Sequence, residues 1–154
     1  MSISPREPIS FGDRPKDDAI RDALSRLELF LPESLDDGLD SDQLESLCGH
    51  LRKLHAVIRM RHAAVRIEMA SPGVPPLPPE LVDERHRLCE EYFAFLGQID
   101  RLLRSVETFL HAPPEDTDVF VLRVRELIAS LRRHEAEEDR LFYLAVWRDI
   151  GGES

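Results

Sequence analysis

The 154-residue chain has little of what a β-rich, disulfide-bonded or membrane-spanning protein needs. Aromatic residues make up 6% of the chain and it has seven glycines, which argues against a β-sandwich. An apolar share of 42% argues against a disordered chain. No segment approaches the run of about 18 apolar residues that a membrane span requires. The length suits a single domain with its own core, and together these features predict an all-α protein.

Cysteine is also scarce. The two cysteines, Cys48 and Cys89, both fall within helical patterns, and no Cys-x-x-Cys motif pairs them. Isolated thiols of this kind are a weak metal signal and are typical of small buried apolar groups. The N-terminus lacks a basic region followed by an apolar run. We therefore expect a reducing, cytoplasmic location.

The chain has fewer basic than acidic residues, and its formal net charge is −10. Such a surface repels nucleic acid backbones and anionic lipid. Basic residues gather on one predicted helix, where Glu45, Glu68 and the acidic remainder of the chain surround them. They are Arg52, Lys53, Arg59, Arg61 and Arg66. A solvated helix face explains this group better than a nucleic acid site, so we expect neither nucleic acid nor membrane as a partner.

What the sequence does contain is helical periodicity. Apolar residues recur at alternating steps of three and four in four segments, as in amphipathic helices. The predicted helices span 15 to about 31, Ser41 to about Ala70, about 79 to 109, and about 116–118 to 149. Ser41 with Glu45 is a loose capping signal for the second helix.

The segments between these helices contain the helix breakers. Residues 1–14 have two prolines and no period, which predicts a loose arm. Residues 71–79 have five prolines, which predicts a short stiff connector between antiparallel helices. The sequence therefore predicts one domain over 15–150, folded as an up-down-up-down four-helix bundle.

Several ionisable residues occupy positions where the predicted inner faces should be apolar. In the fourth helix the inner stripe is Phe120, Val124, Leu127, Leu131, His134, Glu138, Leu141 and Ala145. The ionisable residues on the predicted inner faces of the three long helices are His55, His62, His86, Glu90, His134 and Glu138. Buried groups of this kind cost several kcal/mol unless they are paired, hydrogen-bonded or bound to metal. They are therefore the candidate functional residues.

Their spacing and register predict a metal site. Residues four apart share a helix face and lie about 6 Å apart along its axis, so a histidine and a glutamate at that spacing can reach one metal. A register centred on the loops places His62 opposite His86 and Glu90 opposite Glu138. Two carboxylates between histidines suit a dinuclear site of iron, manganese or zinc. The predicted ligands are His62, His86, Glu90, His134 and Glu138.

Two segments, ERHRL in the third helix and LIASLRRHEAEEDRLFY in the fourth, resemble the hemerythrin-like family of cation-binding proteins. Helices of that family end in a pattern like L-x-x-H-x-x-x-E-E/D-x-x-L-F. The resemblance is best from Glu84 to Ile150, weaker over the second helix and undetectable over the first. It implies a four-helix bundle with a non-haem di-iron centre that binds oxygen or nitric oxide, or senses iron and redox state.

Carried over by position, His134 and Glu138 match the motif of the family's last helix. His86 matches the histidine of its third helix, and His62 matches the histidine of its second helix. The sequence departs from the family at Arg66, where a glutamate is expected. The first helix also supplies no histidine. The implied ligand set is therefore incomplete unless Glu90 and His55 substitute.

Two functions follow, and the sequence leaves both open. In the first, the bundle holds non-haem iron or another divalent metal and binds or senses a small diatomic ligand or redox state. In the second, it is a metal-free protein–protein interaction module, with a homodimer through an apolar helix face as one form. His134 and Glu138 would then be a hydrogen-bonded pair tied to Arg66 or Arg133. A di-iron oxidoreductase or ferroxidase ranks behind both, and no nucleophile, phosphate loop or triad motif indicates another enzyme.

Overall fold

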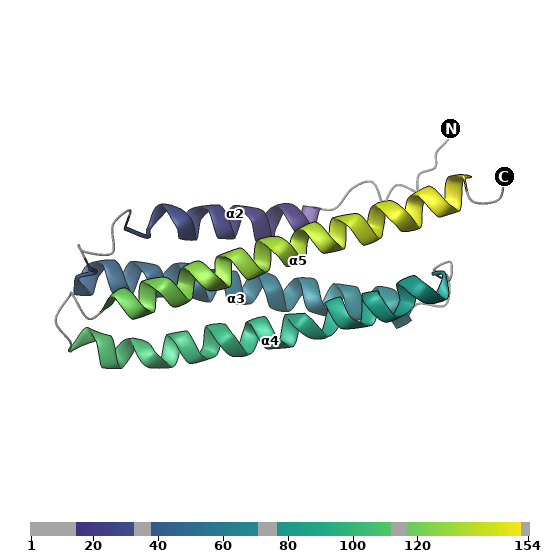
Figure 1. Ribbon diagram of the computed structural model, residues 1–154. Helices are drawn as coiled ribbons and strands as arrows, with labels where there is room; N and C mark the ends of the chain where they lie inside the picture. Colours follow the sequence, from purple (N-terminus) through teal and green to yellow (C-terminus); the bar gives the residue numbers. More distant parts are fainter. Residues whose placement is uncertain (1–14, 33–37, 71–76, 112–116, 152–154) are drawn as a thin grey trace, which may run out of the picture.

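The fold is described by a computed structural model that covers residues 15–32, 38–70, 77–111 and 117–151, without the side chains of 15–18 and 146–151. It contains four α-helices, which are α2 (Pro15–Leu29), α3 (Ser41–Ala70), α4 (Pro79–Leu110) and α5 (Asp118–Gly151), as Figure 1 shows. No β-strand occurs in these four ranges. The predicted arm at 1–14 and most of the predicted connector at 71–79 lie outside the described residues.

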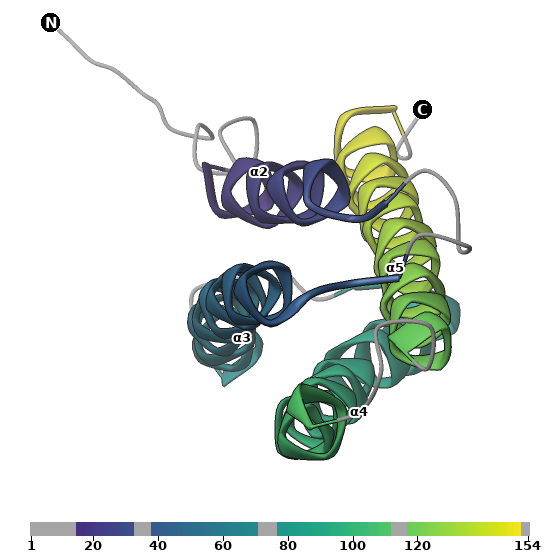
Figure 2. The ribbon, with the colours of Figure 1, turned by 90° about the vertical axis from the view of Figure 1, so that its left-hand side faces the viewer.

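The helices form an up-down-up-down bundle, which confirms the predicted fold. Each helix packs against the next one along the chain, and α2 also contacts α5, so the four form a ring when viewed along the bundle (Figure 2). Helix α2 has 15 residues, whereas α3 has 30 and α5 has 34. It therefore lies along only one half of the bundle (Figure 1).

Helix α3 begins with a reciprocal capping box. The backbone N–H of Gln43 donates to Oδ1 of Asp40 at 2.8 Å, and the backbone N–H of Asp40 donates to Oε1 of Gln43 at 2.9 Å. The N-cap residue is therefore Asp40. The sequence interpretation had placed the cap at Ser41, which was wrong. Two donors at the helix end that would otherwise lack partners are satisfied in this way.

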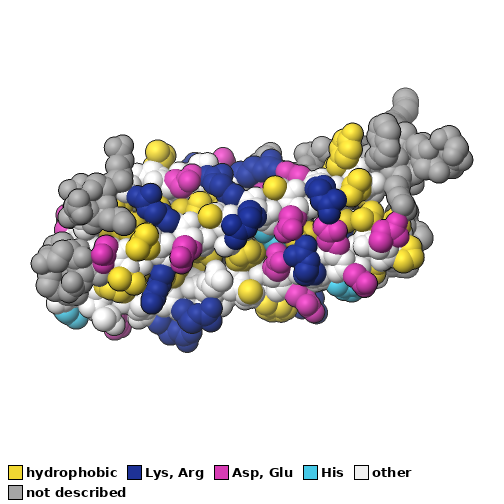
Figure 3. Space-filling model, viewed as in Figure 1, with side chains coloured by type: hydrophobic (Ala, Val, Ile, Leu, Met, Phe, Trp, Pro, Cys, Tyr) yellow, Lys and Arg dark blue, Asp and Glu magenta, His cyan; other side chains and the backbone are white. Residues whose placement is uncertain are grey.

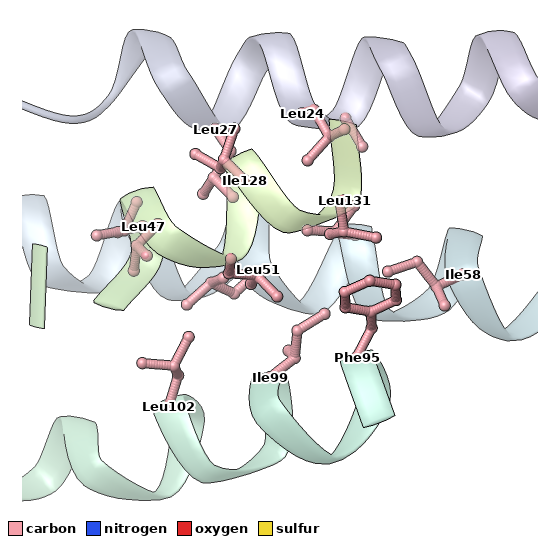
Figure 4. Packing of buried hydrophobic residues seen from close by; sticks show 14 of the residues in the cluster. Leu24, Leu27, Leu47, Leu51, Ile58, Phe95, Ile99, Leu102, Ile128 and Leu131 are labelled. Atoms are coloured by element: carbon pink, nitrogen blue, oxygen red, sulfur yellow. The ribbon is translucent and has the colours of Figure 1, made fainter. Parts of the chain in front are cut away.

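The main core receives side chains from all four helices. Leu24 of α2, Leu51 of α3, Ile99 of α4 and Leu131 of α5 meet there, each at most 1% exposed (Figure 4). A second, much smaller cluster contains Leu81 and Leu88 of α4 and Leu141 of α5, with Leu77, just before α4, packed against it. The core is thus deepest in the half of the bundle that α2 covers.

Membrane insertion finds no support in these helices. Within the described ranges, none of them is both long enough and apolar enough to cross a bilayer.

Candidate functional site

Three of the five predicted metal ligands are buried in the bundle. The exposed fractions are 6% for His62, 1% for His134 and 8% for Glu138, so the predicted inward orientation of His134 and Glu138 is confirmed. All three lie where α3, α4 and α5 come together. They form the centre of a buried polar cluster, which we define as Arg61, His62, Tyr92, His134 and Glu138.

The other two predicted ligands, His86 and Glu90, do not join the cluster. Both side chains are exposed on α4, so the prediction that they point inward is wrong. Leu88 faces α5, and a rotation of 100° per residue places His86 and Glu90 roughly 160° around the helix from it. The sequence of this helix offers two regular apolar stripes. The stripe of Leu88, Tyr92, Phe95 and Ile99 is buried, whereas the stripe of Val82, His86, Cys89, Phe93 and Leu96 is not the inner face, because His86 and Phe93 are exposed.

Glu138 is held by two groups from two other helices. The hydroxyl of Tyr92 on α4 donates a hydrogen bond of 2.5 Å to Oε1 of Glu138. The Nη2 atom of Arg61 on α3 lies 3.8 Å from Oε2. Arg61 is only 5% exposed, so the pair is a buried ion pair. Carboxylate and guanidinium thus offset each other's charge where water cannot solvate them.

Arg61 corrects two interpretations of the sequence. It was assigned to a solvated basic face, but its side chain is buried. The cation expected beside Glu138 was Arg66 or Arg133, and both of these are exposed. The contact falls to Arg61 because it continues the buried row of α3 through Leu54, Ile58 and Val65. These positions alternate in steps of three and four, which is the signal that could have identified it.

The surroundings of Tyr92 favour its neutral form. Burial raises the pKa of Tyr92 far above its ordinary value, and the negative charge of Glu138 raises it further. The nearby Arg61 guanidinium acts in the opposite direction but is outweighed. The hydroxyl therefore remains a hydrogen-bond donor to Glu138 across the whole physiological range.

Tyr92→Phe should make the unfolding free energy less dependent on alkaline pH. A tyrosine whose folded pKa is raised adds stability below its unfolded pKa of about 10, and that stability is lost as the pH rises, by up to about 1.4 kcal/mol per pH unit. At neutral pH the variant should be less stable by about 1.5–3 kcal/mol, because a hydrogen bond to a charged group is lost. Urea unfolding of both proteins between neutral and alkaline pH measures this. If the unfolding free energies of the parent and the variant fall equally as the pH rises, the prediction is wrong.

His134 uses one ring nitrogen in a hydrogen bond to backbone. Its Nε2 lies 2.8 Å from the carbonyl oxygen of Leu88, which can only accept, so Nε2 carries the proton. The other nitrogen, Nδ1, lies 3.9 Å from Oε1 of Glu138, too far for the predicted hydrogen bond between the two. Nδ1 has no hydrogen-bond partner among the described residues. The ring packs edge-on against Tyr92, with centroids 4.6 Å apart.

His62 lies on the α4 side of the cluster. Its ring packs edge-on against Phe93 at a centroid distance of 4.3 Å and lies 5.7 Å from Tyr92. Burial, followed by the charge of Arg66, lowers the pKa of His62 and favours the neutral ring. The predicted partner His86 lies nearly two helical turns away from Phe93 along α4. The register based on the centre of the loop was therefore wrong for α3 and α4.

His55, the substitute ligand considered from sequence, lies outside the cluster. Its Nε2 is 3.2 Å from Oδ1 of Asp100 on α4, and its side chain is 22% exposed. This half-exposed contact joins α3 to α4 and is an ion pair only when the imidazole is charged.

The residues present do not fit a dinuclear iron centre. Such a centre needs bridging carboxylates, and Glu138 is the only carboxylate within the cluster. Glu90 is exposed, and Oε1 of Glu91 lies 3.7 Å from Nε2 of His134, the nitrogen that already donates to the backbone. Both oxygens of Glu138 already face Tyr92 or Arg61. In the part of the chain that the structure describes, no three His, Cys, Asp or Glu side chains come together to hold a metal ion. Tyr92 and Arg61 are the groups that face Glu138, whereas Nε2 of His62 and Nδ1 of His134 have no hydrogen-bond partner among the described residues.

Comparison of the chain with protein-family models, with curated proteins and with solved structures found no match in any of the three.

Proposed function

We propose that the chain is a metal-free helical bundle that acts by binding a partner on its surface. The observation that carries this proposal is the buried ion pair between Arg61 and Glu138. In the hemerythrin-like arrangement that the sequence resembles, the glutamate matching Glu138 binds iron. Here the same carboxylate contacts a guanidinium, which supplies positive charge without a metal.

Electrostatics favours this reading over a metal site. Two unit positive charges about 4 Å apart repel by roughly 4 kcal/mol at the effective dielectric constant of a protein, and a divalent ion doubles that cost. A metal bound to Glu138 would lie close to Arg61, whose side chain is only 5% exposed and has little room to withdraw into water. The cluster is then a structural element of the core.

Metal analysis tests the proposal directly. We expect untagged protein incubated anaerobically with excess ferrous iron and then desalted to retain less than about 0.2 metal ions per chain. The matched variant is the double replacement His134→Leu with Glu138→Leu. We expect its metal content to be as low as that of the parent. About two ions per chain in the parent, lost in the double variant, would instead establish the iron-binding function predicted from sequence.

The outer face of α3 supports a binding role. Three rows with a seven-residue spacing run along it, and every member of them is exposed. The rows are Arg52, Arg59 and Arg66; Gly49, Ala56 and Ala63; and Lys53, Met60 and Ile67. Met60 is 68% exposed. Small residues allow another helix to approach closely, and the neighbouring arginines select one that is acidic.

The partner that fits this face is an acidic amphipathic helix. Within the described ranges, Arg52, Arg59 and Arg66 form no ion pair with a carboxylate. A second copy of α3 would bring two rows of arginine together, so repulsion disfavours a homodimer through this face. A helix with glutamates at a seven-residue spacing would neutralise the row and cover Met60.

A synthetic helix with that pattern tests the face. We expect it to bind the protein, and Met60→Glu to weaken binding about tenfold, because the substitution adds repulsion and removes apolar contact. The matched control is Leu122→Glu on α5, whose side chain is 44% exposed. Fluorescence anisotropy of the labelled peptide gives the affinities. Absence of binding, or equal weakening by the control, would rule out this face.

We also propose that the protein works in the cytoplasm. Both Cys48 and Cys89 are free, buried thiols. Burial is the main influence on each and raises the pKa of both thiols. Such groups stay protonated and unreactive, as in proteins that keep their cysteines reduced.

A further inference from the structure

The charged residues along the boundary of α4 and α5 differ between its two ends. Towards the start of α4, arginines face carboxylates across the boundary. Arg87 lies 3.4 Å from Glu137, and Arg140 lies 3.1 Å from Glu84. Further along the same boundary, towards the end of α4, this pairing stops.

There a groove of about 690 Å³ opens between the two helices. It is lined by Arg101 of α4 and by Arg123 and Arg133 of α5. Basic side chains of both helices, all of them arginines, are visible on this side of the molecule in Figure 3. In the described part of the chain none of the three arginines pairs with a carboxylate, and Arg133 only donates to the hydroxyl of Ser130 at 3.2 Å. Three arginines thus line one hollow of a protein whose net charge is −10.

The remainder of the lining restricts what could bind. Leu102 and Leu127 give the groove an apolar part, and Glu126 is its one carboxylate. No aromatic side chain lines it, so there is no surface on which a planar base would stack. The volume lies within the range of about 300–1,000 Å³ that is usual for small-molecule sites. The lining suits an aliphatic ligand that carries anionic groups.

We propose that this groove binds a small organic anion whose two or three oxyanion groups, phosphate or carboxylate, are separated by a short aliphatic frame. Guanidinium groups bind both kinds of oxyanion through paired hydrogen bonds. Arg123 and Arg133 are ten residues apart, which places their backbones about 15 Å apart along α5. Charges at both ends of a ligand therefore match the groove better than one compact ion. The aliphatic frame would lie against Leu102 and Leu127.

The net charge of the whole chain limits the size of the ligand. A long polyanion would extend beyond the groove over an acidic surface, where it is repelled. A small anion feels chiefly the groups within about 8 Å, the screening length at physiological ionic strength. This site is independent of the buried polar cluster and of the outer face of α3, so its test does not depend on either.

Calorimetric titration with three probes tests the site. Hexane-1,6-diyl bisphosphate and suberate carry separated phosphates and separated carboxylates, and inorganic phosphate is the compact control. We expect saturable binding of at least one of the two elongated anions, about tenfold or more tighter than inorganic phosphate. Whichever of them binds more tightly identifies phosphate or carboxylate as the preferred group.

Substitutions locate the binding. Arg101→Gln, Arg123→Gln or Arg133→Gln should each weaken it about tenfold, because one charge-assisted hydrogen-bonding group is lost. Glu126→Gln should strengthen it severalfold by removing the only negative charge in the groove. The matched control is Arg104→Gln, an exposed arginine of α4 outside the groove, which should leave binding unchanged. The proposal is overturned if neither elongated anion binds, if inorganic phosphate binds as tightly, or if Arg104→Gln weakens binding equally.

Discussion

Glu138→Leu should lower the free energy of unfolding by about 3–5 kcal/mol, because it removes a buried carboxylate that faces the buried guanidinium of Arg61. Glu138 is 8% exposed and Arg61 only 5%, so water cannot replace the lost carboxylate. The substitution also removes the acceptor of the Tyr92 hydroxyl, which is fully buried. Urea unfolding followed by circular dichroism measures the loss. The slope of the transition should stay unchanged if the fold is kept.

The double replacement of Arg61 and Glu138 by leucine should recover most of that loss. Both charges disappear together, and leucine suits the apolar positions on either side of them. The matched control is Glu28→Leu, which breaks an exposed ion pair with Arg132 and should change stability by less than about 1 kcal/mol. A single Glu138→Leu variant as stable as the parent would show that the pair does not hold the core together. The same conclusion would follow if the double variant of Arg61 and Glu138 were no more stable than the single variant Glu138→Leu.

Leu51→Ala should destabilise the protein by about 3–4 kcal/mol, the second largest effect we expect. Leu51 is fully buried and lies among side chains of the other helices (Figure 4). Removing it creates a cavity that this surrounding structure cannot easily close. Leu141→Ala should cost less, about 2 kcal/mol, because the small cluster around Leu141 contains few buried side chains and can relax.

The difference between these two leucine variants is the informative measurement. Leu51 lies in the half of the bundle that has four helices, and Leu141 belongs to the small cluster between α4 and α5. Chemical unfolding under identical conditions compares them directly. Equal losses would mean that the end of the bundle beyond α2 is packed as rigidly as its centre.

Helix existence and bounds could be predicted from the sequence because the apolar period is strong and prolines interrupt it. The predicted 41–70 and 79–109 agree with α3 and α4 to within one residue. The capping box was also readable as Asp40-x-x-Gln43, a pattern that the choice of Ser41 overlooked. These features depend on residues close together in sequence, which is why one chain suffices to find them.

The inward face of each helix was harder to predict, because a wide apolar face offers two regular stripes. In α4 the stripe through His86 is as periodic as the stripe through Leu88, and only the position of α5 decides between them. In α3 the same ambiguity hid Arg61, since a charged residue is assigned to the surface unless its partner is known. That partner, Glu138, is far away in sequence, so the buried pair could be recognised only after the helices were packed.

The contact between the first and last helices has a consequence for folding order. The contacts between α2 and α3, α3 and α4, and α4 and α5 join neighbours in the chain, whereas the α2 contact with α5 joins residues more than 100 positions apart. Arg21 with Asp139 spans 118 positions and Arg132 with Glu28 spans 104. Closing so long a loop costs more entropy than forming the hairpins of adjacent helices. The three hairpins should therefore form first, with docking of α2 onto α5 as the final step that closes the ring.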